Sequence, residues 1–186
     1  MKFAFLLALT LGLTPAGALA AAPASADSAA LDKLYARLAK TPYSDEAVGI
    51  LAEIDQLRTQ SGSDTADLLL ARAQKARAAA NLPLALQLFD AVVDLDPEWS
   101  EAWSERASAR YQSGDVGGAM GDLAQTLKRE PRDVGALAGL GAILLDSGYP
   151  EAALKVYDRA LKLAPAYEPL QEAHARAQTM VWSRSP

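Results

Sequence analysis

The 186-residue sequence contains no cysteine and a single histidine, and aromatic residues make up only 6% of it. Without cysteine the chain forms neither disulfides nor thiolate metal sites, and it lacks the residue that carries the lipid of a lipoprotein. A Ser-His-Asp site would have to use His174, which lies in a predicted terminal helix. We therefore predict that the protein is not an enzyme, binds no metal or cofactor, and has no lipid anchor.

The sequence also lacks the glycine-rich motifs of nucleotide-binding proteins, both Gly-x-x-x-x-Gly-Lys-Ser/Thr and Gly-x-Gly-x-x-Gly after a strand. Gly117, Gly118 and Gly121 do cluster, at the start of a predicted helix. We expect them to permit close helix packing, at a cost in helix propensity, rather than to surround a phosphate.

Positive charge is in short supply, because 18 Lys and Arg residues face 23 Asp and Glu residues and the net charge is −5. No basic cluster offsets this acidic balance. Nucleic acids and anionic lipid surfaces both need Lys and Arg for neutralisation. Neither is expected as a partner.

The longest apolar run is confined to the N-terminus, where Lys2 precedes an apolar stretch over residues 3–13. Small-x-small motifs follow, with cleavage expected after Ala20 or Ala26. This pattern is typical of a secretory signal peptide, and the run is short for a membrane span. We predict that residues 1–26 are a signal peptide and that the protein is exported. The alternative is an uncleaved membrane anchor.

The dominant positive feature is a period of 34 residues, marked by Pro97, Pro131 and Pro165. Small and large apolar residues recur at fixed distances before each proline: Leu69, Trp103 and Leu137; Ala73, Ala107 and Gly141; Ala85, Ala119 and Ala153; Phe89, Leu123 and Tyr157. A fixed period of this length predicts stacked helical hairpins, each of which buries its apolar face against a neighbour.

The period divides the chain into three repeats at residues 66–99, 100–133 and 134–167. A hairpin at 27–65, with helices expected over 31–39 and from Ser44 to about residue 61, is out of phase with the repeats and is expected to cap them. In the segment 168–186, a closing helix over about 168–181 places polar Gln171, His174 and Gln178 where a further repeat would be apolar. A solvent-facing cap has this character.

These residues resemble the tetratricopeptide repeat (TPR) family, whose pattern is W-x2-L-G-x2-Y…A-x3-F…P. The second repeat departs from the pattern, because Arg106 and Arg110 occupy its Leu and Tyr positions, and we expect weaker packing there. The resemblance implies an all-α, right-handed α-solenoid of helix-turn-helix repeats with N- and C-terminal capping helices. The layout is similar to that of small periplasmic TPR proteins of Gram-negative bacteria.

The resemblance also implies a function, which is binding a peptide or helix of another cell-envelope protein in a concave groove. In TPR arrays the first helix of each hairpin lines that groove. The matching positions here are Leu70, Gln74, Arg77, Glu101, Ser104, Ser108, Tyr111, Gly135, Ala138, Ala142, Leu145 and, from the closing helix, Arg176. We expect a floor of small apolar residues toward the third repeat, with Tyr111 as an aromatic anchor.

Several TPR domains bind the acidic tails of heat-shock chaperones through a clamp of Lys, Asn and Arg. The matching positions here include Glu105, Gly135 and Gly139, which cannot hold a carboxylate, so the resemblance does not extend to that activity. Two alternatives to the scaffold remain open. One is a structural component that assembles with copies of itself, and the other is an assembly factor anchored by an uncleaved leader.

Overall fold

The structure is a computed structural model that describes residues 26–183, with side chains from residue 28. The predicted signal peptide and the last residues, 184–186, lie outside this range, apart from the backbone of Ala26. Within residues 26–183 the chain forms helices and no strands. These helices are α1 (Ala26–Leu38), α2 (Ser44–Arg58), α3 (Asp64–Ala78), α4 (Leu82–Leu95), α5 (Ser100–Gln112), α6 (Val116–Arg129), α7 (Val134–Asp146), α8 (Pro150–Leu163) and α9 (Glu168–Trp182).

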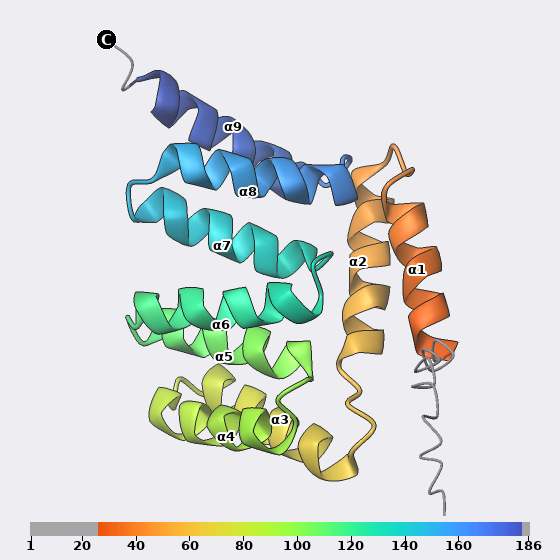
Figure 1. Ribbon diagram of the computed structural model, residues 1–186, viewed down its shortest axis with the longest axis vertical. Helices are drawn as coiled ribbons and strands as arrows, with labels where there is room; N and C mark the ends of the chain where they lie inside the picture. The colour runs from red at the N-terminus through yellow and green to blue at the C-terminus, as the bar shows by residue number, and fades with distance from the viewer. Residues whose placement is uncertain (1–25, 184–186) are drawn as a thin grey trace, which may run out of the picture.

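The pairs α3/α4, α5/α6 and α7/α8 form antiparallel hairpins that stack in chain order (Figure 1). Helices α4, α6 and α8 begin 34 residues apart, at Leu82, Val116 and Pro150. The predicted all-α solenoid with terminal helices is therefore confirmed. Among the helices that the structure describes, none is both long and apolar enough to span a lipid bilayer.

The small and large positions of the repeat pack against each other inside each hairpin. Ala73 and Phe89 are fully buried in the first repeat, and Gly141 and Tyr157 take the same roles in the third. A Cβ atom on Gly141 would overlap the ring of Tyr157. The small residue thus lets the two helices approach closely enough for the aromatic ring to fill the core between them.

Each of the three hairpin turns contains one residue with a left-handed backbone conformation, at the same position of the repeat. It is Gly114 in the second repeat (φ 84°) and Gly148 in the third (φ 83°), and Ala80 takes this conformation in the first (φ 57°). The next residue, Asn81, caps α4 by accepting a hydrogen bond from the Leu84 amide at 3.3 Å. Ala80 adopts a backbone region that favours glycine.

Of the three glycines in α6, only Gly118 serves close packing, so that expectation was wrong for Gly117 and Gly121. A Cβ atom on Gly117 or Gly121 would meet nothing within 4 Å. At Gly118 it would overlap the capping Asp115 side chain and the Arg110 side chain of α5. Gly117 and Gly121 thus lower the helix propensity of α6 without a packing benefit, whereas Gly118 makes room for Asp115 and Arg110.

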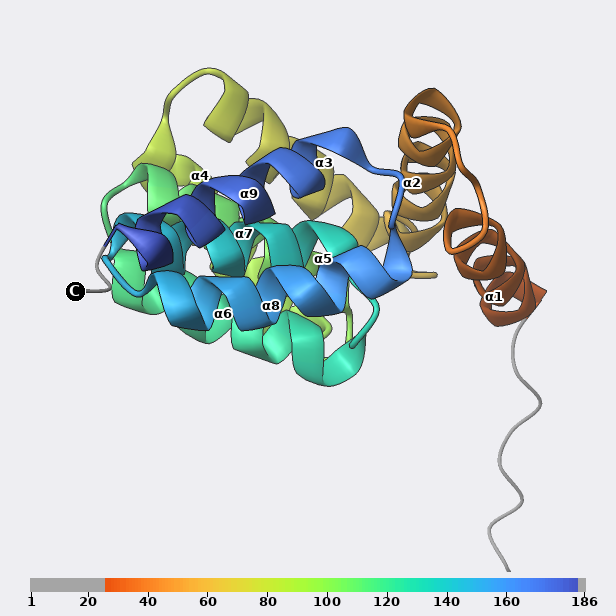
Figure 2. The ribbon, with the colours of Figure 1, turned by 90° about the horizontal axis from the view of Figure 1, so that it is seen from above.

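The N-terminal hairpin α1/α2 lies along the side of the stack rather than on the free face of the first repeat (Figures 1 and 2). Helix α2 crosses the ends at which α5, α7 and α9 begin. Its first residue, Ser44, accepts a hydrogen bond from the Glu168 amide of α9 at 3.3 Å, and the Trp99 indole before α5 donates to the Arg58 carbonyl at 2.8 Å. The N-cap residue of α2 is Tyr43, whose side chain makes no capping hydrogen bond.

Helix α1 covers the outer side of α2 and reaches the loop before α7. The Arg132 guanidinium of that loop bonds Asp32 at 2.6 Å and stacks 4.3 Å from the centre of the Tyr35 ring. Apolar residues of the hairpin, including Leu38 and Ile50, join the core cluster that contains Leu137 and other residues of α7, α8 and α9. The hairpin is thus part of the core of the last repeat and the closing helix.

Helix α9 closes the array by burying Leu170 and Ala177 against α8. Gln171 and Gln178 are exposed, as expected of a cap that faces solvent. The ring of His174 lies 2.9 Å from a carboxylate oxygen of Asp158 on α8. Trp182 ends the helix with 84% of its surface exposed, so it does not fold back on the cap.

Candidate peptide-binding groove

The centre of the predicted groove is a hollow between α5 and α7, with a volume of about 280 Å³. We call it the α5–α7 hollow. It is lined by Ser104, Ala107, Ser108, Tyr111, Leu123, Gly135, Gly139, Ala142 and Ile143. Five of the predicted groove residues therefore meet here: Ser104, Ser108, Tyr111, Gly135 and Ala142. Small residues on α7 keep one wall low, and apolar side chains from α6 and α7 form part of the floor.

A larger hollow of about 820 Å³ adjoins it between α7 and α9, and the two share Ala142. We call it the α7–α9 hollow. Its lining contains two further predicted residues, Leu145 and Arg176, together with Asp146, Tyr157, Thr179 and Met180. No ion pair to the Arg176 guanidinium occurs among residues 28–183. This end of the groove thus offers an apolar wall beside an exposed cation.

At its other end the α5–α7 hollow adjoins a small cavity of about 140 Å³ under α2, and both are lined by Gly135. We call it the α2 cavity. It is lined by Tyr35, Leu51, Ile54, Asp55, Arg58, Asp133, Val134, Gly135, Ala138 and Tyr167. Ala138 was predicted to line the groove, whereas the contribution of α1 and α2 was not. The N-terminal hairpin therefore supplies a wall at one end of the groove.

Four predicted residues do not line these hollows. Leu70 is 1% exposed and packs in the core of the first repeat. Gln74 and Arg77 both bind the Glu105 carboxylate of α5, at 2.8 and 2.6 Å, and Glu101 turns toward Arg58 of α2. The first repeat thus contributes contacts with its neighbour rather than an open surface, because its polar side chains are engaged with α5.

The residues between α2, α5 and α7 form an acidic cluster around one arginine. The Arg58 guanidinium binds Asp133 at 2.6 Å and lies 3.4 Å from Glu101. Burial raises the pKa of Glu101 to about 7; Arg58 opposes this shift, and the carboxylates of Asp133, Glu105 and Asp55 add to it. Desolvation and the neighbouring carboxylates likewise raise the pKa of Asp55. Negative charge is therefore in excess at this end of the groove.

Tyr111, the predicted aromatic anchor, is 41% exposed at the edge of the α5–α7 hollow. Its hydroxyl donates a hydrogen bond to Asp146 at 2.8 Å, and this bond raises the tyrosine pKa. Asp146 also lines the α7–α9 hollow. The pair holds the ring in place across the two repeats and leaves its face available to a ligand.

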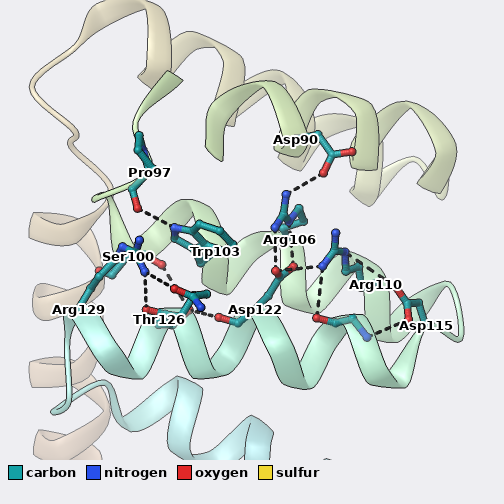
Figure 3. A network of polar contacts seen from close by, with 12 residues as sticks. Asp90, Pro97, Ser100, Trp103, Arg106, Arg110, Asp115, Asp122, Thr126 and Arg129 are labelled. Atoms are coloured by element: carbon teal, nitrogen blue, oxygen red, sulfur yellow. Dashed lines mark hydrogen bonds and ion pairs between the residues drawn. The ribbon is translucent and has the colours of Figure 1, made fainter. Parts of the chain in front are cut away.

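Behind the groove, the second repeat contains a buried polar network in place of the expected apolar residues (Figure 3). The Arg106 guanidinium donates to both carboxylate oxygens of Asp122, at 2.9 and 2.8 Å, and to Asp90 of the first repeat at 2.8 Å. Arg110 lies 3.0 Å from the same Asp122, which is 2% exposed. The expected loss of packing is offset, because both arginines have a buried carboxylate partner and Arg106 also stacks on Trp103.

Three groove residues contributed by the N-terminal hairpin, Tyr35, Asp55 and Arg58, were not predicted from the sequence. A repeat period predicts which residues of neighbouring repeats lie close together, but the hairpin at 27–65 is not one of the repeats. In contrast, an arginine in a buried apolar position requires an acidic partner. That requirement could have identified a nearby carboxylate such as Asp122, sixteen residues after Arg106 and in the partner helix, but only weaker packing was predicted.

Within residues 28–183, no group of three or more His, Cys, Asp or Glu side chains is placed to hold a metal ion. The hollows themselves present small and apolar side chains together with charged ones.

Comparison with known proteins agrees with the repeat architecture. The sequence profile described as "Tetratricopeptide repeat" matches residues 70–125 and 104–168. A TPR repeat-containing protein of Rhizobium etli is 37% identical over 142 residues, which cover 76% of this chain and 70% of that protein. A small glutamine-rich tetratricopeptide repeat-containing protein of Mycosarcoma maydis is 29% identical over 64% of this chain, but the match covers only 34% of that protein.

Solved structures share the fold at low sequence identity. The first TPR of Spaghetti (RPAP3), bound to an HSP90 peptide, superposes with a TM-score of 0.61 at 20% identity, covering 63% of this chain and 93% of that chain. The Yersinia enterocolitica type III secretion chaperone SycD, in complex with a peptide of the translocator YopD, gives 0.57 at 19% identity, with 65% and 92% covered.

Proposed function

The chain belongs to the tetratricopeptide repeat family, and from this premise we propose that it is a non-catalytic adaptor that binds a peptide or helix of another protein in its groove. The observation that carries the proposal is the α5–α7 hollow, whose wall consists of Gly135, Gly139 and Ala142. Such short side chains let the backbone of a partner come close to α7, and the exposed ring of Tyr111 provides an aromatic contact beside them.

Two structurally similar proteins support this function, because the Spaghetti TPR holds an HSP90 peptide and SycD holds a peptide of YopD. The chemistry of the ligand differs here from the acidic peptide of the Spaghetti complex. Glu105 stands where the carboxylate clamp of the family needs a polar or basic side chain, and it already binds Arg77. The groove is therefore not a site for the acidic tails of chaperones.

We further propose that the protein is exported to the periplasm and serves a partner in the cell envelope. The support is the signal pattern of residues 1–26. Intact-mass measurement is expected to show a mature protein that starts at Ala21 or Asp27 and is released by osmotic shock. A retained Met1, with sedimentation in the membrane fraction, would favour the anchored assembly factor instead.

The proposed binding mode is tested with the pair Ala142→Arg and Ala124→Arg. Both alanines are exposed on helices, but Ala142 lines the groove and Ala124 lies on α6 outside the three hollows. After crosslinking in the periplasm and affinity capture, Ala142→Arg is expected to lose the partner that the parent and Ala124→Arg retain. Unchanged capture by Ala142→Arg, with loss in Ala124→Arg, would place the working surface on the convex side.

Self-assembly is a second candidate, supported by large apolar side chains exposed near both ends of the array. Leu68 and Leu95 are 53% and 50% exposed in the first repeat, and Trp182 is 84% exposed at the end of α9. Light scattering over a range of concentrations distinguishes the two functions. A mass that stays monomeric supports the adaptor, and a mass that rises with concentration supports assembly.

A further inference from the structure

The end of the groove next to α2 contains more negative charge than its own cations neutralise. Arg58 is paired with Asp133 at 2.6 Å, and Arg77 with Glu105 at 2.6 Å. Glu101 is left with one contact, 3.4 Å from an Arg58 that is already engaged. Within residues 28–183, the Asp55 carboxylate receives neither a hydrogen bond nor an ion pair, although it lines the α2 cavity.

A second feature of the same cavity is a pair of buried polar atoms without a hydrogen-bond partner among the described residues, the Tyr35 hydroxyl and the Arg58 Nε–H. The Arg58 side chain already binds Asp133 through its terminal nitrogen, so the Tyr35 hydroxyl and the Asp55 carboxylate are the groups left for a ligand. Tyr35 lines the α2 cavity and is only 6% exposed, yet its hydroxyl has no hydrogen-bond partner among the described residues. A buried polar group without a partner costs free energy, and a ligand that supplies the partner recovers that cost. The Tyr35 hydroxyl can donate or accept, whereas the ionised Asp55 carboxylate only accepts, so a donor group can bind both, and positive charge on that donor suits the carboxylate.

The size and walls of the cavity fit one basic side chain. A volume of about 140 Å³ equals that of about five water molecules at ~30 Å³ each, close to the five heavy atoms of a lysine side chain. Leu51, Ile54 and Val134 provide apolar wall for the methylene stem of such a side chain. Asp55 also lies in the last turn of α2, where the helix dipole favours a cation.

Resting on the proposed function of the groove, we propose that its partner is a basic segment: a lysine or arginine side chain enters the α2 cavity and meets Asp55 and Tyr35, with Glu101 and Asp133 nearby, while the following apolar residues lie in the α5–α7 hollow. The shared wall at Gly135 connects the two sites, so consecutive side chains of one extended segment or helix reach both. The preferred charge is opposite to that of the acidic peptides bound by the chaperone clamp.

The experiment uses the full mature chain and a phage-displayed library of random short peptides, followed by fluorescence anisotropy of each selected peptide. Selected peptides are expected to contain Lys or Arg next to apolar residues. Replacement of that basic residue by Gln is expected to weaken binding by about tenfold, and Asp55→Asn by a similar factor. The two changes together should weaken binding no more than either alone, because they remove the same contact.

Asp94→Asn is the matched control, because Asp94 is exposed on α4 outside the three hollows; it should leave the affinity unchanged. The affinity of the basic peptide should also fall as the pH is lowered through about 7, where Glu101 takes up a proton, and the Gln peptide should not show this fall. Circular dichroism of Asp55→Asn checks that the fold is retained, which we expect for an exposed side chain.

Selection of acidic peptides would overturn the basic-segment proposal. So would a loss of affinity for the pair of Asp55→Asn and the Gln peptide that equals the product of the two separate losses. If Ala142→Arg abolishes binding of such peptides, the groove function stands and only the charge preference fails. If Ala142→Arg leaves binding intact, or no peptide is selected, both proposals fail.

Discussion

The ion pair between Arg106 and Asp122 provides the sharpest test of the energetics of this array, because the TPR pattern places an apolar residue where Arg106 stands. We consider the single substitutions Arg106→Leu and Asp122→Ala, and the double substitution that combines them. The double variant restores the apolar character of the repeat and removes both charges. The comparison shows whether the network stabilises the protein or only compensates for a buried arginine.

The expected magnitudes follow from burial. Asp122 is 2% exposed and holds Arg106 through two hydrogen bonds, so Asp122→Ala leaves a largely buried guanidinium with the exposed Asp90 as its remaining ion-pair partner. Removal of one partner from a buried pair costs about 3–5 kcal/mol. Arg106→Leu is milder, at about 1–3 kcal/mol, because Asp122 keeps Arg110 at 3.0 Å. The double variant is expected within about 1 kcal/mol of the parent.

Urea unfolding followed by circular dichroism gives the four free energies of unfolding by linear extrapolation. The interaction energy in this cycle should be at least about 2 kcal/mol. Asp94→Ala, on the exposed side of α4, is the control and should change stability by less than about 0.5 kcal/mol. In Asp122→Ala, amides of α6 should also exchange faster than those of α8.

Two outcomes would refute this reasoning. Single substitutions that each cost less than about 1 kcal/mol would mean that the arginines reach solvent when Asp122 is lost. Costs that add in the double variant would mean that the network has no pairwise energy, and that each side chain acts only through its own packing.

Three further predictions concern single positions. Gly141→Ala should lower the free energy of unfolding by about 1–3 kcal/mol, because its Cβ overlaps the Tyr157 ring, whereas Gly121→Ala in open space should raise it by about 0.5–1 kcal/mol. Ala80→Gly should raise the melting temperature, because the left-handed backbone at Ala80 costs the parent up to about 1 kcal/mol and glycine adopts it without that cost. A lower melting temperature would show that Ala80 is not strained. The parent should lose stability as pH rises from about 4.5 to 7, because the folded state holds the proton of Glu101 more tightly; Glu101→Gln should then be up to about 3 kcal/mol more stable than the parent at pH 8, with no difference at pH 4.

The parts of the fold that repeat were predictable from the sequence, because a period constrains each residue through its equivalents. Gly141 and Tyr157 illustrate this, since the period identified a small position and a large one, and the structure brings these two residues into contact. The residues of α5 and α7 that line the groove were likewise predicted from their equivalent positions in the 34-residue repeat. Gln74 and Arg77 did not, because whether a polar side chain faces a groove or binds a neighbouring carboxylate depends on the residue opposite, here Glu105.

The position of the N-terminal hairpin was beyond prediction for a different reason. Its helices follow from apolar spacing, but their docking depends on contacts such as Arg58 with Asp133, which are separated by 75 residues and belong to no repeated pattern. The excess negative charge at the groove end depends on this docking, because Asp55 reaches the groove only through it.

The docking of α2 also sets a limit on how this array can change in length during evolution. Ordinary solenoids gain or lose whole repeats, because each unit contacts only its neighbours. Here a helix of 15 residues, about 22 Å long, is fastened to α9 at Ser44 and to the start of α7 at Arg58. One more repeat between those anchor points would separate them and leave α2 too short to reach both. The length of α2 therefore disfavours insertion of a repeat between α7 and α9, whereas a repeat added next to α3 and α4 would leave both anchor contacts in place.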